Sequence, residues 1–430
     1  MSKCDEKNCC KEADRAPIIR FVCLLALIVF SANFSFAKAS GAKNGISIDQ
    51  ALELVIASHP LISSKKKALQ AAKDDLSAAK WQIFPNAAFS FRGFDQDGDQ
   101  ANRDQEVLTV SQPIWTGGRI TGAVDLAKAK LEVAKLEVIE AQQTLLIDTV
   151  RAFIELDQAE ASFVISKSNV EEHERLFDII DRRVKASTSP EVDARLAKAR
   201  LAFSRSQLLK NKNAVEVSRA NLEQLIGQSV AAIITAKNLK KETASLAEAE
   251  KAALSFSPAI RKVRQEIIAL TASGRVENSA FFPQLSLGYE KKYGDLSTGQ
   301  DDEKVFLGLD FSPGAGLSSR FSLTANKQRA QSLQDTLLAL EREIRREVQI
   351  TWRQYAAAQM QLSPSKLLVS STSDVMASYL RQYTVGRKSW LDVLNAQREL
   401  VQAKKALVEY QANLDGAAYR LHILKGDFYK

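Results

Sequence analysis

The residues whose type and spacing most resemble a reactive site are four acids in one polar stretch of this 430-residue chain. Asp95, Asp97, Asp99 and Glu106 occupy positions 1, 3, 5 and 12 of a calcium-binding loop. That loop needs glycine at its sixth position, where this chain has Gln100, and it needs a helix on each side. The flanking segments instead alternate between apolar and polar residues, which is typical of strands. We therefore interpret the stretch as a solvated loop.

Histidine, cysteine and serine give no better candidate for a metal site or a nucleophile. The three histidines, His59, His173 and His422, lie far apart in the sequence, and none pairs with another at metal-ligand spacing. Composition alone does not exclude a Ser/His/Asp hydrolase, but the sequence has no nucleophile-elbow motif. All four cysteines lie within the first 37 residues. We expect a protein that is not an enzyme and that has no metal and no cofactor.

Residues 1–37 are typical of a secretory signal peptide. Residues 21–30 are ten consecutive apolar residues that follow Arg15 and Arg20, and small residues around Ala37 suit cleavage. A run this short matches ~30 Å of hydrocarbon poorly, so an uncleaved N-terminal anchor is the less favoured alternative. Export makes nucleic acid an unsuitable partner, and a net charge of +8 from 59 basic and 51 acidic residues is too small an excess to argue for it.

The rest of the chain repeats itself at an offset of about 199 residues. The paired positions occur in the same order through the whole mature chain, which makes coincidence a poor explanation. On this basis we divide the chain into a first repeat at 38–227, a linker at 228–244, a second repeat at 245–426 and a C-terminal tail at 427–430. The pairs are Pro60 with Pro258, Pro85 with Pro283, Pro113 with Pro313, Asp193 with Asp392, and Gly227 with Gly426.

Each repeat predicts helices on both sides of two strands. Only 18 glycines and 9 prolines occur in the chain, which favours long helices. Pro60 begins a helix over 60–82, no glycine or proline lies between Gly122 and Pro190, and another helix covers 190–226. A helix of 122–190 would be ~100 Å long, and its heptad spacing predicts coiled-coil packing. The matching segment 317–385 contains Pro364, which predicts a kink or a local break.

The two strands of each repeat have the pattern of transmembrane β-strands. Segments 85–94 and 304–313 have the ~9–11 residues such strands need, and one face of each is apolar. The other face carries Arg92, Glu290 and Asp310, which suits a water-filled lumen. Four strands leave two open edges, which hydrocarbon does not tolerate, so several copies must share one barrel embedded in outer-membrane lipid. The alternative is a periplasmic coiled-coil scaffold without a pore.

These features together resemble the TolC family of outer-membrane efflux and secretion ducts. The resemblance covers about 47–426, and its most specific stretch is residues 383–398, YTVGRKSWLDVLNAQR, which is similar to the turn and returning helix of the family's periplasmic tip. It implies a mainly α fold with a small β part: a homotrimer whose long α-helical coiled-coil barrel continues a twelve-stranded β-barrel, with four strands from each internally duplicated protomer. It also implies an outer-membrane location with a long periplasmic extension, and partners that are a periplasmic adaptor protein and an inner-membrane transporter.

The resemblance also assigns roles to residues at the tip. It implies that Asp392 forms one carboxylate ring of a periplasmic gate, while Asn395 stands where the family has a second acid. It implies a latch between Lys388 and Asp193, with Tyr383 as a further hydrogen-bonding candidate. Capping of helix N-termini by the two acids is an equally good explanation of their positions. Gly386 and Arg387 are candidates for contact with the adaptor or the pump.

Two functions within this family fit the sequence. The tip GRKSWLDVLNAQREL favours the outer-membrane component of type I protein secretion, with an ABC transporter that exports a large protein such as an adhesin. The alternative is the outer-membrane component of a proton-driven multidrug efflux pump.

Overall fold

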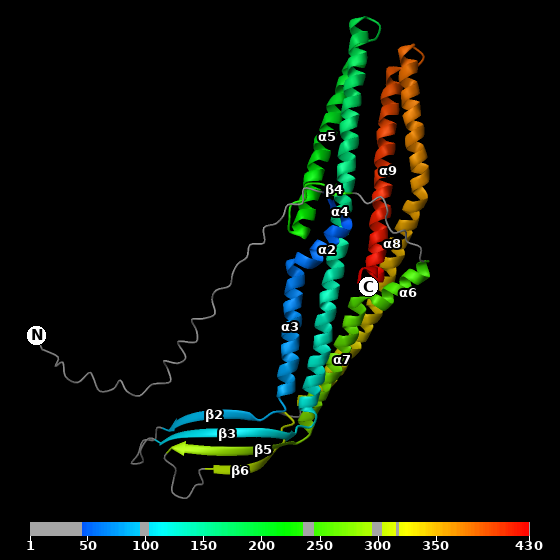
Figure 1. The fold of residues 1–430 in the computed structure, drawn as a ribbon. Helices are drawn as coiled ribbons and strands as arrows, with labels where there is room; N and C mark the ends of the chain where they lie inside the picture. The colour runs from blue at the N-terminus through cyan, green and yellow to red at the C-terminus, as the bar shows by residue number, and fades with distance from the viewer. Residues whose placement is uncertain (1–44, 95–102, 235–244, 295–302, 315–317, 430) are drawn as a thin grey trace, which may run out of the picture. The chain divides into compact units, whose positions relative to one another are not determined.

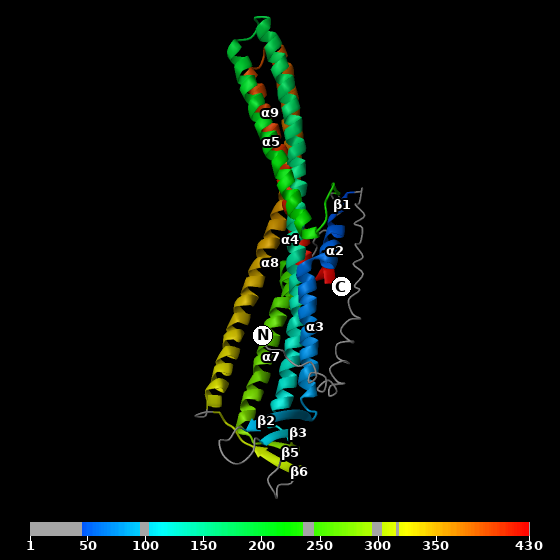
Figure 2. The same cartoon turned by 90° about the vertical axis from the view of Figure 1, so that its left-hand side faces the viewer.

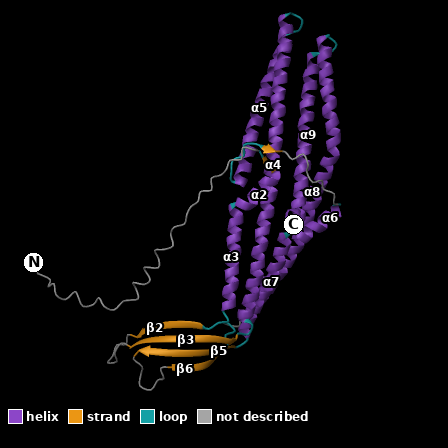
Figure 3. Cartoon of the chain, in the orientation of Figure 1, coloured by secondary structure: helices purple, strands orange, loops and turns teal. Residues whose placement is uncertain are grey.

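The computed structural model describes residues 45–94, 103–234, 245–294, 303–314 and 318–429 (Figure 1). The expected signal peptide and the acids Asp95, Asp97 and Asp99 of the calcium-like loop lie outside these residues. Within the described ranges the chain forms eight α-helices and two small sheets. Long helices make up most of it, and one four-stranded sheet lies at one end of the helices (Figure 3).

The two halves of the chain carry the same helices at nearly the same lengths. The counterparts have 11 and 11, 22 and 21, 67 and 67, and 36 and 36 residues. The first half contains α2 (Ile48–Ser58), α3 (Pro60–Trp81), α4 (Arg119–Lys185) and α5 (Glu191–Ile226). The second half contains α6 (Leu246–Phe256), α7 (Pro258–Asn278), α8 (Ser318–Thr384) and α9 (Trp390–Lys425). Two single turns of 3₁₀ helix, η1 (Ser279–Phe281) and η3 (Asp427–Tyr429), complete the helical elements.

Local chemistry explains where the shorter helices begin. Ser47 and Ser245 cap α2 and α6 in capping boxes with Gln50 and Glu248, which satisfies N–H groups that have no partner within the helix. Pro60 and Pro258 stand at the first position of α3 and α7, where a missing N–H costs nothing. The helix starts predicted at the two prolines are confirmed.

The helix α8 runs without interruption through Pro364, so of the kink or local break expected there, the break is wrong. Proline removes one donor, the N–H that would have reached the carbonyl of Met360 four residues earlier. Met360 is 72% exposed, so this turn of the helix lies at the surface. The hydroxyl of the next residue, Ser365, donates to the carbonyl of Gln361 at 2.7 Å, which supports the backbone at this point.

The short helices α2 and α6 pack against the long ones and create two of the three apolar clusters. Helix α2 packs on α4 and α5 around Leu146, Leu156 and Leu222, all fully buried. Helix α6 packs on α8 and α9 around Val348 and Leu421. Figure 2 shows α2 beside α4 on one side of the long helices. The third cluster joins α4, α5, α8 and α9 near their tips.

The four-stranded sheet is antiparallel throughout and has the order β2-β3-β5-β6. Its strands are β2 (Asn86–Phe94), β3 (Arg103–Trp115), β5 (Gln284–Gly294) and β6 (Glu303–Asp310). The two halves of the chain are joined at its centre, where β3 pairs with β5. A second, two-stranded parallel sheet pairs β1 (Ile46–Ser47) with β4 (Ile233–Ile234).

The strand expected at 304–313 is shorter than predicted. Strand β6 ends at Asp310, which pairs with Gln284, the first residue of β5. Beyond Asp310 the neighbouring strand offers no further partner, and Pro313 has no N–H to donate. The strand expected at 85–94 begins one residue later, at Asn86.

Candidate functional site

The turn between α4 and α5 and the turn between α8 and α9 have the same backbone geometry. In each, two N–H groups bond back to carbonyls of the last helical turn, which is the Schellman arrangement. One residue per turn must adopt the left-handed conformation, and these are Ser187 at φ 56° and Gly386 at φ 75°. The four bonds, of 2.8–3.0 Å, run from Ser187 to Val184, Thr188 to Arg183, Gly386 to Tyr383 and Arg387 to Gln382.

Asp392 caps the start of α9. Its Oδ2 accepts bonds from the N–H and the hydroxyl of Ser389 at 3.1 and 2.8 Å, and its own N–H donates to that hydroxyl at 3.2 Å. These bonds favour the ionised carboxyl, so the pKa of Asp392 lies below its ordinary value, with a smaller effect from the nearby charge of Lys388. The capping explanation therefore holds for this acid.

Asp193 forms no capping box, although in α5 it stands at the same place as Asp392 in α9, three residues after the N-cap. The N-cap of α5 is Pro190, which has neither an N–H nor a side-chain acceptor to complete a capping box. Among the described residues the carboxylate of Asp193 accepts no hydrogen bond and forms no ion pair. Lys388 lies with its Nζ 4.3 Å above the ring of Tyr379, so Lys388 and Asp193 do not pair within one protomer.

The two tips are instead joined through Tyr383. Its hydroxyl lies 3.3 Å from Oγ of Ser189, to which Nε of Arg183 also donates at 3.3 Å. The guanidinium of Arg183 lies 5.0 Å from the centre of the Tyr383 ring, and the ring of Trp390 lies 5.2 Å from it on another side. Tyr383 is 6% exposed, so this contact belongs to the apolar cluster at the tips. Sequence reasoning selected Tyr383 but missed Arg183 and Ser189.

Two of the three remaining tip candidates are exposed, and the third is half-buried. Gly386 and Arg387 are exposed in the turn before α9, with no atom within 4 Å of the position of an added Cβ at Gly386. Asn395 is half-buried one turn into α9. Its amide has no hydrogen-bond partner within the described residues.

One face of the four-stranded sheet is apolar and exposed. Phe89, Leu307 and Leu309 belong to this face and are 63%, 67% and 69% exposed. Leaving such side chains in water is unfavourable, and the pattern fits contact with lipid. At the end of the strands away from the helices the face becomes polar, where Lys291 pairs with Glu303 at 2.5 Å.

The opposite face of the sheet carries the expected lumen residues. Glu290 lies there between two lysines, with its Oε1 3.0 Å from Nζ of Lys304 and 3.8 Å from Nζ of Lys292. Asp310 belongs to the same face at the helical end, and Arg92 belongs to it by register, since it pairs with Gln105. Sequence reasoning missed both lysines, although the period of two that selected Glu290 also selects them.

Neither a metal site nor a membrane-spanning helix is present in the described parts of the chain. No three His, Cys, Asp or Glu side chains of these residues come together in a metal-binding arrangement. None of the described helices is both long enough and apolar enough to cross a membrane.

Comparison with known protein families shows the family to which this chain belongs. A model of the family described as "outer membrane efflux protein" matches the chain twice, over residues 51–228 and 250–427. The chain belongs to the outer membrane efflux protein family. The resemblance to TolC channels is thereby confirmed, and the prediction of an outer-membrane location with a long periplasmic helical part is confirmed with it.

Individual relatives are distant but cover most of the chain. The outer membrane efflux protein BepC of Brucella suis biovar 1 is 18% identical over 368 residues, which are 84% of this chain and 81% of BepC. The pyoverdine export outer membrane protein OpmQ of Pseudomonas putida is 22% identical over 388 residues, which are 86% of this chain and 78% of OpmQ. The outer-membrane channel OprN has a solved structure that matches with a TM-score of 0.77 at 20% identity, over 88% of this chain and 89% of OprN. At these identities the structural match shows the fold, a TolC-like channel with long helices and few strands.

Proposed function

We propose that three copies of this outer-membrane efflux protein assemble into one continuous duct that carries cargo through the periplasm and the outer membrane. The observation that carries the proposal is the open sheet. In the described residues β2 pairs only with β3 and β6 only with β5, so each protomer has two unpaired edges beside a lipid-facing surface. Pairing β6 of one copy with β2 of the next removes every edge and gives twelve strands.

The helices offer matching surfaces for the same assembly. Helix α8 exposes Phe321, Met360 and Leu367, while α5 exposes Phe203 and Leu209. Large apolar side chains in such numbers on two separate helices are typical of an interface. Packing α8 of one protomer against α5 and α3 of the next would bury both sets.

The hairpin tips are the proposed periplasmic gate. Because the carboxylate of Asp193 has no partner among the described residues of its own protomer, we propose that it pairs with Lys388 of a neighbouring copy. One exposed ion pair contributes about 0–1 kcal/mol, so three would hold a gate that still opens. Asp392 and Asn395 would form two rings around the threefold axis, only the first of them charged. Gly386 and Arg387, exposed at the turn, are proposed to meet the periplasmic adaptor or the inner-membrane pump.

The duct itself catalyses no reaction in this proposal, because the inner-membrane transporter supplies the energy. We assign that transporter to type I protein secretion, which makes a large exported polypeptide the cargo. The tip sequence supports this assignment. The second candidate is a proton-driven multidrug pump, and the efflux and pyoverdine-export relatives favour a small-molecule cargo of that kind.

Conductance in planar lipid bilayers tests the duct. Detergent-purified protein should migrate as a cross-linkable trimer and should pass small, cation-selective currents, since a carboxylate ring attracts cations. A monomer that stays in solution without detergent and never conducts would establish the scaffold alternative instead.

Two substitutions test the latch separately from the duct. Lys388→Ala and Asp193→Ala should each enlarge the current, because each removes one side of the proposed ion pair. Lys366→Ala is the matched control, since it removes an exposed lysine of the same helical hairpin away from the tip. Unchanged currents in both tip variants would remove the latch and leave the duct in place.

The cargo class needs a test in cells. Deleting the protein should abolish secretion of the polypeptide that the partner ABC transporter handles and should leave resistance to small-molecule drugs unchanged. Loss of drug resistance with normal polypeptide secretion would establish the efflux alternative.

A further inference from the structure

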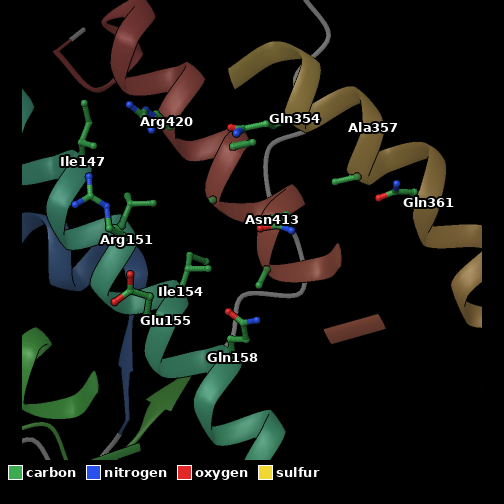
Figure 4. A pocket seen from close by; sticks show the side chains of 15 residues that line it. Ile147, Arg151, Ile154, Glu155, Gln158, Gln354, Ala357, Gln361, Asn413 and Arg420 are labelled. Atoms are coloured by element: carbon green, nitrogen blue, oxygen red, sulfur yellow. The ribbon is translucent and has the colours of Figure 1, made fainter. Parts of the chain in front are cut away.

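A groove of about 510 Å³ lies where α4, α9 and α8 run side by side (Figure 4). Its floor is formed by the small residues Ala412 and Gly416 of α9. Its walls are formed by residues of successive turns of α4, between 147 and 158, and of α8, between 354 and 361. Figure 4 shows Gln158 and Arg151 reaching toward it from α4, and Gln354 and Gln361 from α8. Its volume lies in the range of ligand sites, ~300–1,000 Å³.

The lining combines side-chain amides and small residues with three aliphatic side chains, Ile147, Val150 and Ile154, and with three charged ones, Arg151, Glu155 and Arg420. Gln158, Gln354, Gln361 and Asn413 all line the groove, and no residue lining it is aromatic. Each side-chain amide offers both a donor and an acceptor without net charge. This set complements the N–H and C=O groups of a peptide backbone, which present the same two functions in alternation.

The charged residues at the groove are mostly engaged with other partners. Arg420 pairs with Glu347 at 2.6 Å, and Arg151 pairs with Asp148 at 3.5 Å. The Nε–H of Arg420 nevertheless has no acceptor among the described residues. That nitrogen is buried, so it is not available to a ligand in the groove.

The length of the groove suits a short stretch of extended chain. Its lining runs from Ile147 to Gln158 along α4, which is about 16 Å at 1.5 Å per residue. An extended polypeptide covers that distance in about five residues. Four amides over five residues give nearly one side-chain partner for each residue of the guest.

The groove lies on the side of the helices that α2 and α6 leave uncovered. On α4, Arg151, Ile154 and Gln158 face the groove. Leu145, Phe153 and Leu156, which belong to the cluster built around α2, lie on the opposite side of α4, while Val150 belongs both to that cluster and to the groove lining.

The same separation holds on α9. Asn413 and Gly416 line the groove, while Leu421 packs in the cluster with α6 on another side of the helix; Ala417 belongs to both, and no residue of α2 or α6 lines the groove. Neither of the two short helices therefore covers the groove.

That uncovered side faces the bore of the proposed duct. Twelve helices about 9 Å apart form a ring about 35 Å across between helix axes, with about 25 Å clear inside. Copies of α2 and α6 from three protomers, each helix about 10 Å thick, would fill that space. They must lie outside the ring, so the groove opens inward.

We propose that this groove binds an extended, polar segment of the polypeptide cargo as it passes through the duct, one groove in each of the three protomers. The inference rests on the proposed function, because it needs an open bore. It names the chemistry that this bore recognises: backbone amides, in a site whose lining has four side-chain amides and no aromatic side chain.

Current blockades in planar bilayers test the groove directly. The probe is a synthetic 20-residue unstructured peptide of Gly, Ser, Asn and Thr, added on the side of the β-barrel so that the periplasmic tip does not obstruct it. The variant combines Gln158→Ala, Gln354→Ala and Asn413→Ala. Removing three amide partners should shorten the mean blockade by about tenfold or more.

A control variant combines Gln331→Ala with Gln334→Ala, two exposed glutamines of α8 outside the groove, and should leave the blockades as in the wild type. Equal blockades in groove variant and wild type, in channels that conduct normally, would overturn the inference and leave the duct standing. Longer blockades by ethidium than by the peptide, shortened in the groove variant, would reassign the groove to aromatic cations. Complete absence of conductance would overturn the proposed function and this inference with it.

Discussion

Replacing Asp415 by asparagine should stabilise the protein at neutral pH and have no effect in acid. Asp415 lies on α9 and is 5% exposed. Burial is the main cause that raises its pKa from 3.8 to about 6, and the carboxylate of Asp157 on α4 adds to the shift. Gln411 opposes it by donating to both carboxylate oxygens, at 3.0 and 3.1 Å.

The sign of the pH dependence follows from this shift. A carboxyl whose pKa is higher in the folded state binds its proton more tightly there, so its contribution to stability is present below pH 3.8 and is lost as the pH rises through 6. A shift of about 2 units corresponds to about 3 kcal/mol per protomer at pH 7.5. The neutral amide of Asp415→Asn avoids this cost. With an unfolding entropy of about 2 cal/mol/K per residue, the expected rise in apparent Tm is about 3–4 °C.

Thermal unfolding of the detergent-solubilised protein, followed by circular dichroism, measures the effect at pH 7.5 and at pH 4. The variant should melt higher than the wild type at pH 7.5 and at the same temperature at pH 4. The matched control is Asp178→Asn, an exposed acid on α4, which should change neither. An equal shift at both pH values would mean that packing, not ionisation, is responsible, and a lower Tm at pH 7.5 would refute the reasoning.

Three further predictions concern single residues. Ser187→Gly should raise the stability of the α4–α5 hairpin by about 1 kcal/mol, seen as slower hydrogen exchange at that tip, because serine at φ 56° is strained where glycine is not. Gly288→Ala should impair assembly of the barrel on gels, since an added Cβ would lie 2.2 Å from the ring of Phe306, while Gly274→Ala, with open space around it, should assemble normally. Burial lowers the pKa of His173, so stability should fall as the pH drops below 6.5, and His173→Gln should weaken that acid sensitivity in pH-dependent melting.

The elements that could be predicted from the sequence are those specified by local chemistry. The starts of α3 and α7 follow from Pro60 and Pro258, and the two faces of the sheet follow from alternation along each strand. The family could be identified because the tip segment 383–398 and the repeated order of elements lie in the sequence itself. Two local expectations were not met: α8 has no break at Pro364, where the hydroxyl of Ser365 donates to the carbonyl of Gln361, and β6 ends at Asp310 rather than at Pro313.

The parts that could not be predicted depend on contacts between distant residues. The contact of Tyr383 with Ser189 joins positions 194 residues apart, and no local pattern marks Ser189 as its partner. The amides of the groove come from three helices, so their convergence appears only once α4, α8 and α9 are packed together. The lysines beside Glu290 could have been predicted, because the alternation that places Glu290 on one face of the sheet also places Lys292, two residues on, on the same face.

The two tips show how a repeated sequence can acquire unequal roles. Asp193 and Asp392 occupy equivalent positions, three residues after the N-cap of their helices. At the second tip the N-cap is Ser389, whose hydroxyl and N–H hold Asp392 at its own helix end. At the first tip the N-cap is Pro190, which cannot form these bonds, so the carboxylate of Asp193 is left for a partner outside its helix. A single difference at the N-cap therefore separates an acid held at its own helix end from one whose carboxylate accepts no bond among the described residues. In the proposed gate, the first tip accordingly supplies the acid of the latch and the second tip supplies Lys388.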